Sequence, residues 1–92
     1  MSGVRVSSIE LEEVFGSKSR IRVLKILITY GTVPLSYIRK NVNMNYRDLK
    51  HFLMRLKEAG IIKEYDIGGV KIYELNKENK RTKLLQEIFQ KW

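Results

Sequence analysis

The change in hydrophobic spacing at Gly60 constrains the fold more than any other feature of this 92-residue sequence. Before Gly60, apolar residues recur at the spacing of a helix: Tyr46, Leu49, Leu53 and Leu56, with Phe52 beside them. After it, IIKEYDI and VKIYEL are rich in β-branched and aromatic residues and flank Gly68-Gly69, a signal for a tight hairpin turn. The sequence therefore predicts a helix over about 45–59, followed at once by a two-stranded antiparallel hairpin over 61–75.

Two helices are predicted in the first third of the chain. Ser7 and Glu10 have the spacing of a capping box, which predicts a short helix that runs to Phe15. Gly16 would end that helix in a left-handed conformation, and Ser17 would cap the next one. The second helix is expected to end at Gly31 and to bury the stripe Ile21, Leu24, Leu27 and Ile28.

A third, short helix is expected over about 35–41. Thr32-Val33-Pro34 cannot continue a helix, because proline fixes φ and pushes the preceding residue to an extended conformation, but Pro34 suits a helix start. The asparagine-rich segment 41–45 is typical of a tight turn that ends in a helix cap. Two helices joined by such a turn, with a hairpin after them, form the order of a winged helix-turn-helix.

The C-terminal segment 78–92 predicts an amphipathic helix. Its apolar positions recur at helical spacing: Leu84, Leu85, Ile88, Phe89 and Trp92. The expected fold class is therefore α+β, mostly α: one winged helix-turn-helix domain over 1–92, with a two-stranded antiparallel wing and a C-terminal amphipathic helix. Ninety-two residues leave no room for a second domain.

Positive charge is concentrated in the segment 17–57. The formal net charge is +8, and this segment holds ten Lys or Arg residues and one acidic residue, Asp48. A basic surface over a helix-turn-helix is typical of proteins that bind double-stranded DNA. The alternative is a solubilising lysine-rich surface, as in thermophilic proteins, but such surfaces normally mix both signs of charge.

The sequence resembles a known group of regulators. GSKSRIRVLKIL is similar to the opening core helix, and LKHFLMRLKEAGIIKEY to the recognition helix and first wing strand, of small bacterial and archaeal winged-helix transcription regulators of the arsenic-repressor-like and multiple-antibiotic-resistance-regulator-like kinds. The most specific piece is L-x-x-L-x-x-A-G-I-I over 53–62. The resemblance implies a DNA-binding transcription regulator that pairs through its terminal helices. Arsenic-repressor-like proteins often sense metals through cysteine and histidine, but this chain has no cysteine and one histidine, His51, so no metal is expected.

A recognition helix over 45–59 would lie in the major groove and present a polar stripe opposite its apolar one. The candidates for base contacts are Asn45, Arg47, Lys50 and His51. Arg47 and Lys50 could donate to guanine O6 and N7, and Asn45 could bind adenine or a phosphate. Met54 shares this spacing, but a methionine beside leucines is more often a core filler.

Contacts to the DNA backbone would come from several elements. The candidates are Lys18, Arg20, Arg22, Tyr37, Arg39, Lys40, Arg55, Lys63 and Lys71. Tyr37 could equally be half-buried core. In the wing, over 61–75, Lys71 is the main candidate for contact with the backbone or minor groove, and Asp66 weakens the case.

The terminal Trp92 would be costly to leave exposed, so the helix 78–92 is expected to pair with that of a second copy. The candidates for this homodimer interface are Leu84, Leu85, Ile88, Phe89 and Trp92. The alternative is that Trp92 packs on Ile9, Val14 or Phe15 of its own chain.

The sequence argues against several classes of protein. We find neither a nucleophile with a base, nor paired carboxylates, nor a phosphate-binding glycine loop, so no enzyme and no cofactor are expected. No apolar run approaches the roughly 18 residues of a membrane span, and the N-terminus lacks a secretory signal, so we expect a cytoplasmic, nucleoid-associated protein. Abundant Lys, Arg and Ile without cysteine hint at an archaeal source. Two other functions stay open: a sequence-neutral architectural DNA-binding protein, and a winged-helix protein-interaction module.

Overall fold

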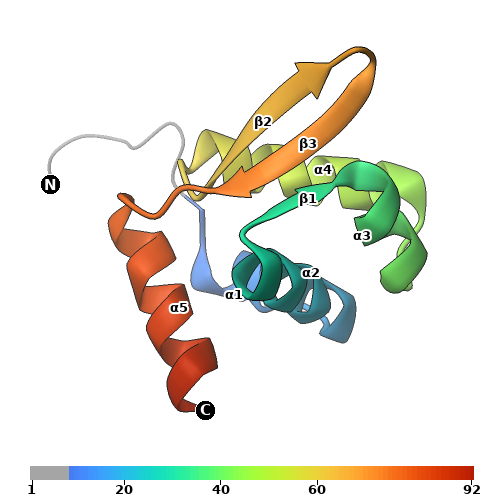
Figure 1. Cartoon of the computed structure of the whole chain (residues 1–92). Coiled ribbons are helices and arrows are strands. Elements are labelled where there is room, and N and C mark those ends of the chain that lie inside the picture. Colours follow the sequence, from blue (N-terminus) through green and yellow to red (C-terminus); the bar gives the residue numbers. More distant parts are fainter. Residues whose placement is uncertain (1–8) are drawn as a thin grey trace, which may run out of the picture.

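The computed structural model describes residues 9–92, which form five helices and three strands. The helices are α1 (Leu11–Val14), α2 (Lys18–Tyr30), α3 (Leu35–Asn41), α4 (Tyr46–Glu58) and α5 (Lys80–Lys91). The strands are β1 (Thr32–Pro34), β2 (Ile62–Ile67) and β3 (Val70–Leu75). Figure 1 shows the β2–β3 hairpin extending beyond the helices, with α5 on the opposite side of the molecule from α3. The predicted winged helix-turn-helix order is confirmed.

Local signals explain most helix ends. The Ser17 side chain accepts a hydrogen bond from the Arg20 N–H at 3.1 Å, as a helix cap does. Gly31, with φ 80°, ends α2 by donating its N–H to the Leu27 carbonyl oxygen at 2.8 Å. The left-handed conformation expected for Gly16 is wrong: a Cβ there would lie 2.8 Å from the Glu12 carbonyl oxygen, so close packing is what requires glycine.

The first helix is shorter than the capping box predicts. It begins at Leu11, and Glu10 is its cap residue in an extended conformation, with no side-chain capping hydrogen bond. A capping box would place Glu10 at the third residue inside the helix, so this prediction is wrong. Its other member, Ser7, lies outside the described residues.

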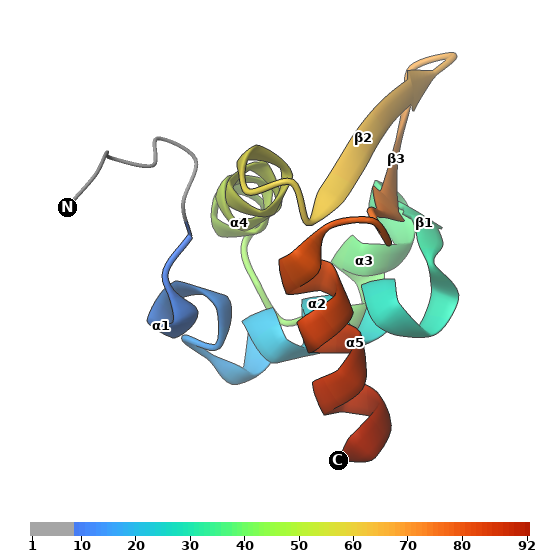
Figure 2. The ribbon, with the colours of Figure 1, turned by 90° about the vertical axis from the view of Figure 1, so that its left-hand side faces the viewer.

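A third strand joins the predicted hairpin. The segment Thr32–Pro34, expected only to interrupt the helices, forms β1 and pairs antiparallel with β3, with Val33 opposite Tyr73. The sheet order is β1-β3-β2, so β1 is an edge strand, where the missing N–H of Pro34 costs no internal hydrogen bond. Figure 2 shows β1 beside β3 at the base of the hairpin.

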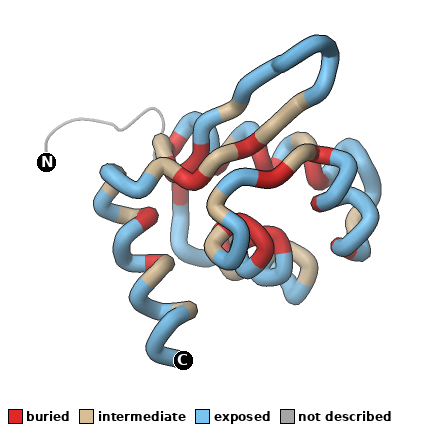
Figure 3. Tube along the Cα trace, in the orientation of Figure 1, coloured by how far each residue is buried: buried red, intermediate tan, exposed pale blue. Residues whose placement is uncertain are grey.

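The hydrophobic core lies between α2, α4, the base of the sheet and the first half of α5 (Figure 3). Its fully buried large side chains include Leu24, Leu27, Ile38, Leu49, Phe52, Leu53, Leu56 and Ile61. Two predicted core positions are wrong, since Ile21 is 38% exposed and Tyr46 is 46% exposed. On α2 the buried face is centred on Val23 and Leu27 instead, which turns Ile21 outward.

The joint between α4 and β2 is held by the segment that leads into α5. Gly60 has φ +79°, and a Cβ there would lie 2.8 Å from the Asn79 Nδ2. The Asn76 Nδ2 donates to the Gly60 carbonyl oxygen at 2.8 Å, and the buried Thr82 hydroxyl donates to the Ile61 carbonyl oxygen at 3.1 Å. These contacts fix the angle at which the hairpin leaves the helix.

Candidate nucleic-acid interface

The N-terminus of α4 is capped by Asn45. The Asn45 Oδ1 accepts the Asp48 N–H at 2.8 Å, and its Nδ2 donates to the Asp48 carboxylate at 3.0 Å. Both polar atoms of the Asn45 side chain are therefore engaged within the helix start. A base contact by Asn45, as the sequence suggests, would have to replace one of these bonds.

The outer face of α4 carries Arg47, Lys50, His51 and Met54. Arg47 and His51 are exposed and Lys50 is partly exposed, while Leu49 and Phe52 of the same helix are buried. Within residues 9–92 none of the three basic side chains forms an ion pair. Met54 is 48% exposed and belongs to this face, so its interpretation as a core filler is wrong. The face combines unpaired hydrogen-bond donors with one apolar group.

The sequence assigns Tyr46 to the buried stripe of α4, but the residue is 46% exposed. It is the first residue of α4, at the margin of the hydrophobic layer, and its ring lies at the surface. The Arg39 guanidinium lies 4.3 Å from the ring centroid, and the Lys50 ammonium lies 5.9 Å from it. These are cation–π distances, so the ring links a cation of α3 to one of α4.

Further predicted backbone contacts lie exposed on α2 and α3. Arg39 and Lys40 are exposed near the end of α3, and Lys18 and Arg22 are exposed on α2. The α2 cations line an open depression of about 450 Å³, together with Ser19, Ile21, Lys25 and Asn43.

The sequence allows Tyr37 to lie either on the surface or half-buried in the core. It is 38% exposed, and its hydroxyl donates to the Tyr30 hydroxyl at 3.2 Å, which raises the pKa of Tyr37. Tyr37 therefore lies on the surface, where its ring meets that of Tyr30 edge to face at 5.4 Å.

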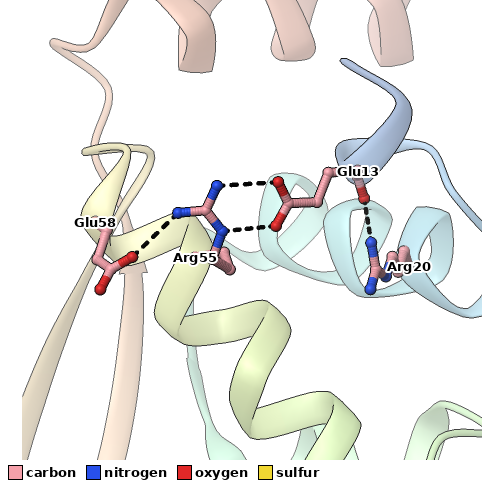
Figure 4. A network of polar contacts seen from close by, with 4 residues as sticks. All are labelled: Glu13, Arg20, Arg55 and Glu58. Carbon is pink, nitrogen blue, oxygen red and sulfur yellow. Dashed lines mark hydrogen bonds and ion pairs between the residues drawn. The ribbon is translucent and has the colours of Figure 1, made fainter. Parts of the chain in front are cut away.

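Two predicted backbone contacts, Arg55 and Arg20, are instead engaged inside the molecule (Figure 4). Arg55 forms a bidentate ion pair with Glu13 of α1, at 2.6 and 3.0 Å, and also contacts Glu58 at 3.2 Å. Hydrogen bonding and charge attraction from Arg55 lower the pKa of Glu13. Arg20 donates to the Glu13 carbonyl oxygen at 2.6 Å, and its guanidinium lies 5.0 Å from the Phe52 ring centroid. These contacts fasten α1 to α2 and α4.

The wing pairs much of its own charge. Glu64 accepts from Lys57 at 2.8 Å and lies 3.2 Å from the Lys71 ammonium, and together these lysines lower the pKa of Glu64 to about 2, with Lys57 contributing most. Lys71 also lies 3.7 Å from Asp66, so the main predicted wing contact is held by two carboxylates. Lys63 is exposed and, within the described chain, forms no ion pair.

The tip of the wing is apolar. Gly68 and Gly69 have φ 59° and 85°, as a type I′ hairpin turn requires, which confirms the predicted tight turn. Ile67 and Val70, which pair across this turn, are 63% and 51% exposed. The hairpin thus presents aliphatic side chains beyond its paired charges.

The C-terminal helix shows both a buried and an exposed apolar side. Leu85 is buried and Phe89 is packed against the core, so the assignment of Leu85 to a dimer interface is wrong. Leu84 and Ile88 are 59% and 45% exposed, and Trp92 is fully exposed. Trp92 therefore does not pack on Ile9, Val14 or Phe15 in the way that the alternative required.

Two further features of residues 9–92 concern metal binding and membranes. No three histidine, cysteine, aspartate or glutamate side chains in this part of the chain are grouped so that they could hold a metal ion. None of the helices in the same range has the length and hydropathy needed to cross a membrane.

The arrangement of helix, turn, second helix and hairpin is that of a winged helix-turn-helix domain. Among solved structures, the chain is similar to the crystal structure of an ArsR family transcriptional regulator, with a TM-score of 0.62, 20% sequence identity and coverage of 88% of this chain and 86% of that one. No protein-family model matches the sequence. No curated protein matches it either. The fold predicted from the sequence, and the resemblance to winged-helix regulators at the level of the fold, are thus confirmed.

Proposed function

We propose that this protein is a transcription regulator that binds double-stranded DNA and reads bases with the outer face of α4. The observation that carries the proposal is the set of basic side chains on that face, Arg47, Lys50 and His51, which form no ion pair with the described residues. Unpaired basic side chains on the exposed face of a helix whose other face is buried suit a major groove, because the duplex offers phosphates on both sides and acceptors at its floor. The ArsR family member with the same fold is itself described as a transcriptional regulator, which supports this choice.

The proposed division of labour follows from where the cations lie. Arg47 and Lys50 donate to guanine O6 and N7, and each good contact of this type discriminates by about 1–3 kcal/mol. Exposed cations on the neighbouring helices neutralise phosphates and set the register: Lys18, Arg22, Arg39 and Lys40. Arg20 and Arg55 take no part, because they are occupied by Glu13.

We also propose a homodimer in which α5 of one copy covers α5 of the other. Leu84, Ile88 and Trp92 lie exposed on this helix, and Leu11 of α1 is 69% exposed as well. A depression of about 350 Å³ between α1 and α5 is lined mainly by apolar side chains, including Leu11, Leu84 and Ile88. A second copy would remove this apolar surface from water and place two α4 helices on one duplex, as a two-fold symmetric site requires.

The oligomeric state can be tested with one charge substitution. Sedimentation of the wild-type chain should show a dimer, and Ile88→Glu should shift it to a monomer with a similar circular dichroism spectrum. Glu87→Lys, on the neighbouring exposed position, is the matched control and should leave the dimer intact. A monomeric wild-type chain at concentrations above about 100 μM would contradict the dimer and leave the DNA proposal standing.

The function is tested by affinity for duplex DNA across a salt series. We expect a selected duplex to be preferred over random duplex by about 10³-fold or more, and Arg47→Ala with Lys50→Ala to erase that preference. The matched control is Lys77→Ala with Lys80→Ala, which removes the same charge from exposed positions near the start of α5.

Other outcomes distinguish the alternatives. Equal binding to both duplexes with a steep salt slope would mean a sequence-neutral architectural protein. No binding at low salt would mean a protein-interaction module and would contradict the proposal.

A further inference from the structure

Tyr46 occupies a position that hydrophobic spacing does not explain. Its ring is 46% exposed at the first residue of α4, although the spacing assigns it to the buried stripe. Two cations from different helices meet this ring, Arg39 of α3 at 4.3 Å and Lys50 of α4 at 5.9 Å. An exposed aromatic ring with two cationic neighbours at the start of a recognition helix calls for a physical account.

The two cations at this ring lack ion-pair partners. Within residues 9–92 no carboxylate lies within ion-pair distance of Arg39 or Lys50. The negative face of the aromatic ring attracts both side chains, which holds two cations at one ring without a paired protein anion. A long side chain that rests on a ring also has fewer conformations to lose when it binds a ligand.

We propose that Tyr46 is a positioning residue of the DNA interface, whose ring holds Arg39 toward a phosphate and Lys50 toward a base edge. This inference rests on the proposed function. Because Arg39 belongs to α3 and Lys50 to α4, the ring couples the contact that sets the register to the contact that reads sequence. Loss of the ring should therefore lower specificity more than it lowers general affinity for DNA.

The first test uses the protein without DNA. In the wild-type chain the ring current of Tyr46 should shift the NMR signals of the Arg39 Cδ and Lys50 Cε protons upfield, and Tyr46→Leu should return them to ordinary positions. Tyr46→Phe keeps the ring and removes the hydroxyl, so its signals should be shifted upfield as in the wild-type chain. Unshifted signals in the wild-type chain would overturn the proposal.

The second test measures affinity for selected and random duplexes. Tyr46→Leu should reduce the preference for the selected duplex by about 2- to 5-fold for each cation that it releases, and Tyr46→Phe should rescue most of that loss. In a Lys50→Ala background, Tyr46→Leu should cost less than in the wild-type background, since one of its two cations is already gone. A merely structural role would produce equal costs in both backgrounds. Thermal unfolding checks that all variants fold.

The outcomes separate this inference from the function on which it rests. If the wild-type chain binds no duplex, the proposed function fails and the inference fails with it. If the wild-type chain prefers its selected duplex and Tyr46→Leu keeps that preference, the function stands and the inference alone is overturned. If Tyr46→Phe loses as much as Tyr46→Leu, the hydroxyl makes the contact and the positioning role is wrong.

Discussion

The outer face of α4 and the β2–β3 wing are both expected to meet DNA, but they treat their charges in opposite ways. On α4, Arg47 is exposed and Lys50 is partly exposed, and within the described chain no carboxylate pairs with either. On the wing, Lys71 lies 3.2 Å from Glu64 and 3.7 Å from Asp66, and Glu64 also holds Lys57. One region offers bare cations, and the other has largely neutralised its own.

If the protein binds DNA as proposed, this difference predicts which region supplies most of the affinity. An unpaired cation gains from a phosphate by releasing counterions, whereas a paired lysine must first give up a carboxylate. Sequence reading and salt dependence should therefore come mainly from the helices. The wing should contribute through Lys63 and through the aliphatic tip, Ile67 and Val70, which is suited to a shallow groove contact rather than to phosphates.

The largest expected effect is the loss of DNA affinity in Arg47→Ala, compared with Lys71→Ala in the wing. Arg47→Ala should weaken binding to the selected duplex by about 1–3 kcal/mol, because the proposed base contact is lost. Lys71→Ala should cost well under about 1 kcal/mol, because that lysine is already paired. Fluorescence anisotropy titrations at one fixed salt concentration compare the two variants. Equal losses would contradict the view that α4 supplies more DNA affinity than the wing.

Substitution at the joint between α4 and the wing should lower the stability of the fold more than substitution at the wing tip. Gly60→Ala places a Cβ 2.8 Å from the Asn79 Nδ2 at φ +79°, so we expect a loss of about 1–3 kcal/mol in the free energy of unfolding. Gly69→Ala has φ +85° and no heavy atom within 4 Å of the added Cβ. It should therefore lose only the free energy that an alanine loses in this backbone conformation. Urea unfolding measures both variants. A greater loss for Gly69→Ala would contradict the view that α4 and the wing are held at a fixed angle.

A carboxylate substitution should make the wing resemble α4. Glu64→Gln removes the carboxylate that pairs with Lys57 and leaves Lys71 with Asp66 alone. Affinity for random duplex should therefore rise, and the salt slope should steepen by up to about 1 unit for each lysine that gains a phosphate. Glu74→Gln is the matched control, since it removes the same charge from the same hairpin but breaks only the hydrogen bond from Tyr65. If both variants raise affinity equally, net charge matters and pairing does not.

Local signals in the sequence were sufficient to predict most of the helices and strands that form α4, the wing and their neighbours. Pro34, Asn45 and Gly60 predicted the bounds of α3 and α4 closely, because each signal acts on neighbouring residues. Strand β1 was missed because Val33 pairs with Tyr73, forty positions along the chain, and three residues carry no periodicity of their own. The third strand is therefore a tertiary effect.

The candidate interface shows the same limit. Spacing separated Arg47 and His51 from the buried side of α4, whereas contact with DNA by these residues stays a prediction. Charge counting could not show that Arg55 is held by Glu13, since these residues lie 42 positions apart. The one sequence signal of such a pair is that Glu10, Glu12 and Glu13 directly precede the basic segment 17–57. Tyr46 was misplaced because helical spacing does not indicate where the hydrophobic layer ends.

The smallest expected effect is a pH dependence that separates the wing from the rest of the protein. The pKa of Glu64 is lowered from 4.5 to about 2, so its ion pairs stabilise the folded chain fully above about pH 4.5 and progressively less as the pH falls toward 2. The difference in unfolding free energy between the wild-type chain and Glu64→Gln should therefore be largest near neutral pH and shrink over that window. Thermal unfolding of both proteins at several pH values between 2 and 7 measures it. Because Glu13 titrates in both chains, its own lowered pKa cancels in the difference. A difference that stays constant with pH would show that Lys57 and Lys71 do not stabilise the Glu64 carboxylate, and the wing would then hold lysines as available to DNA as those of α4.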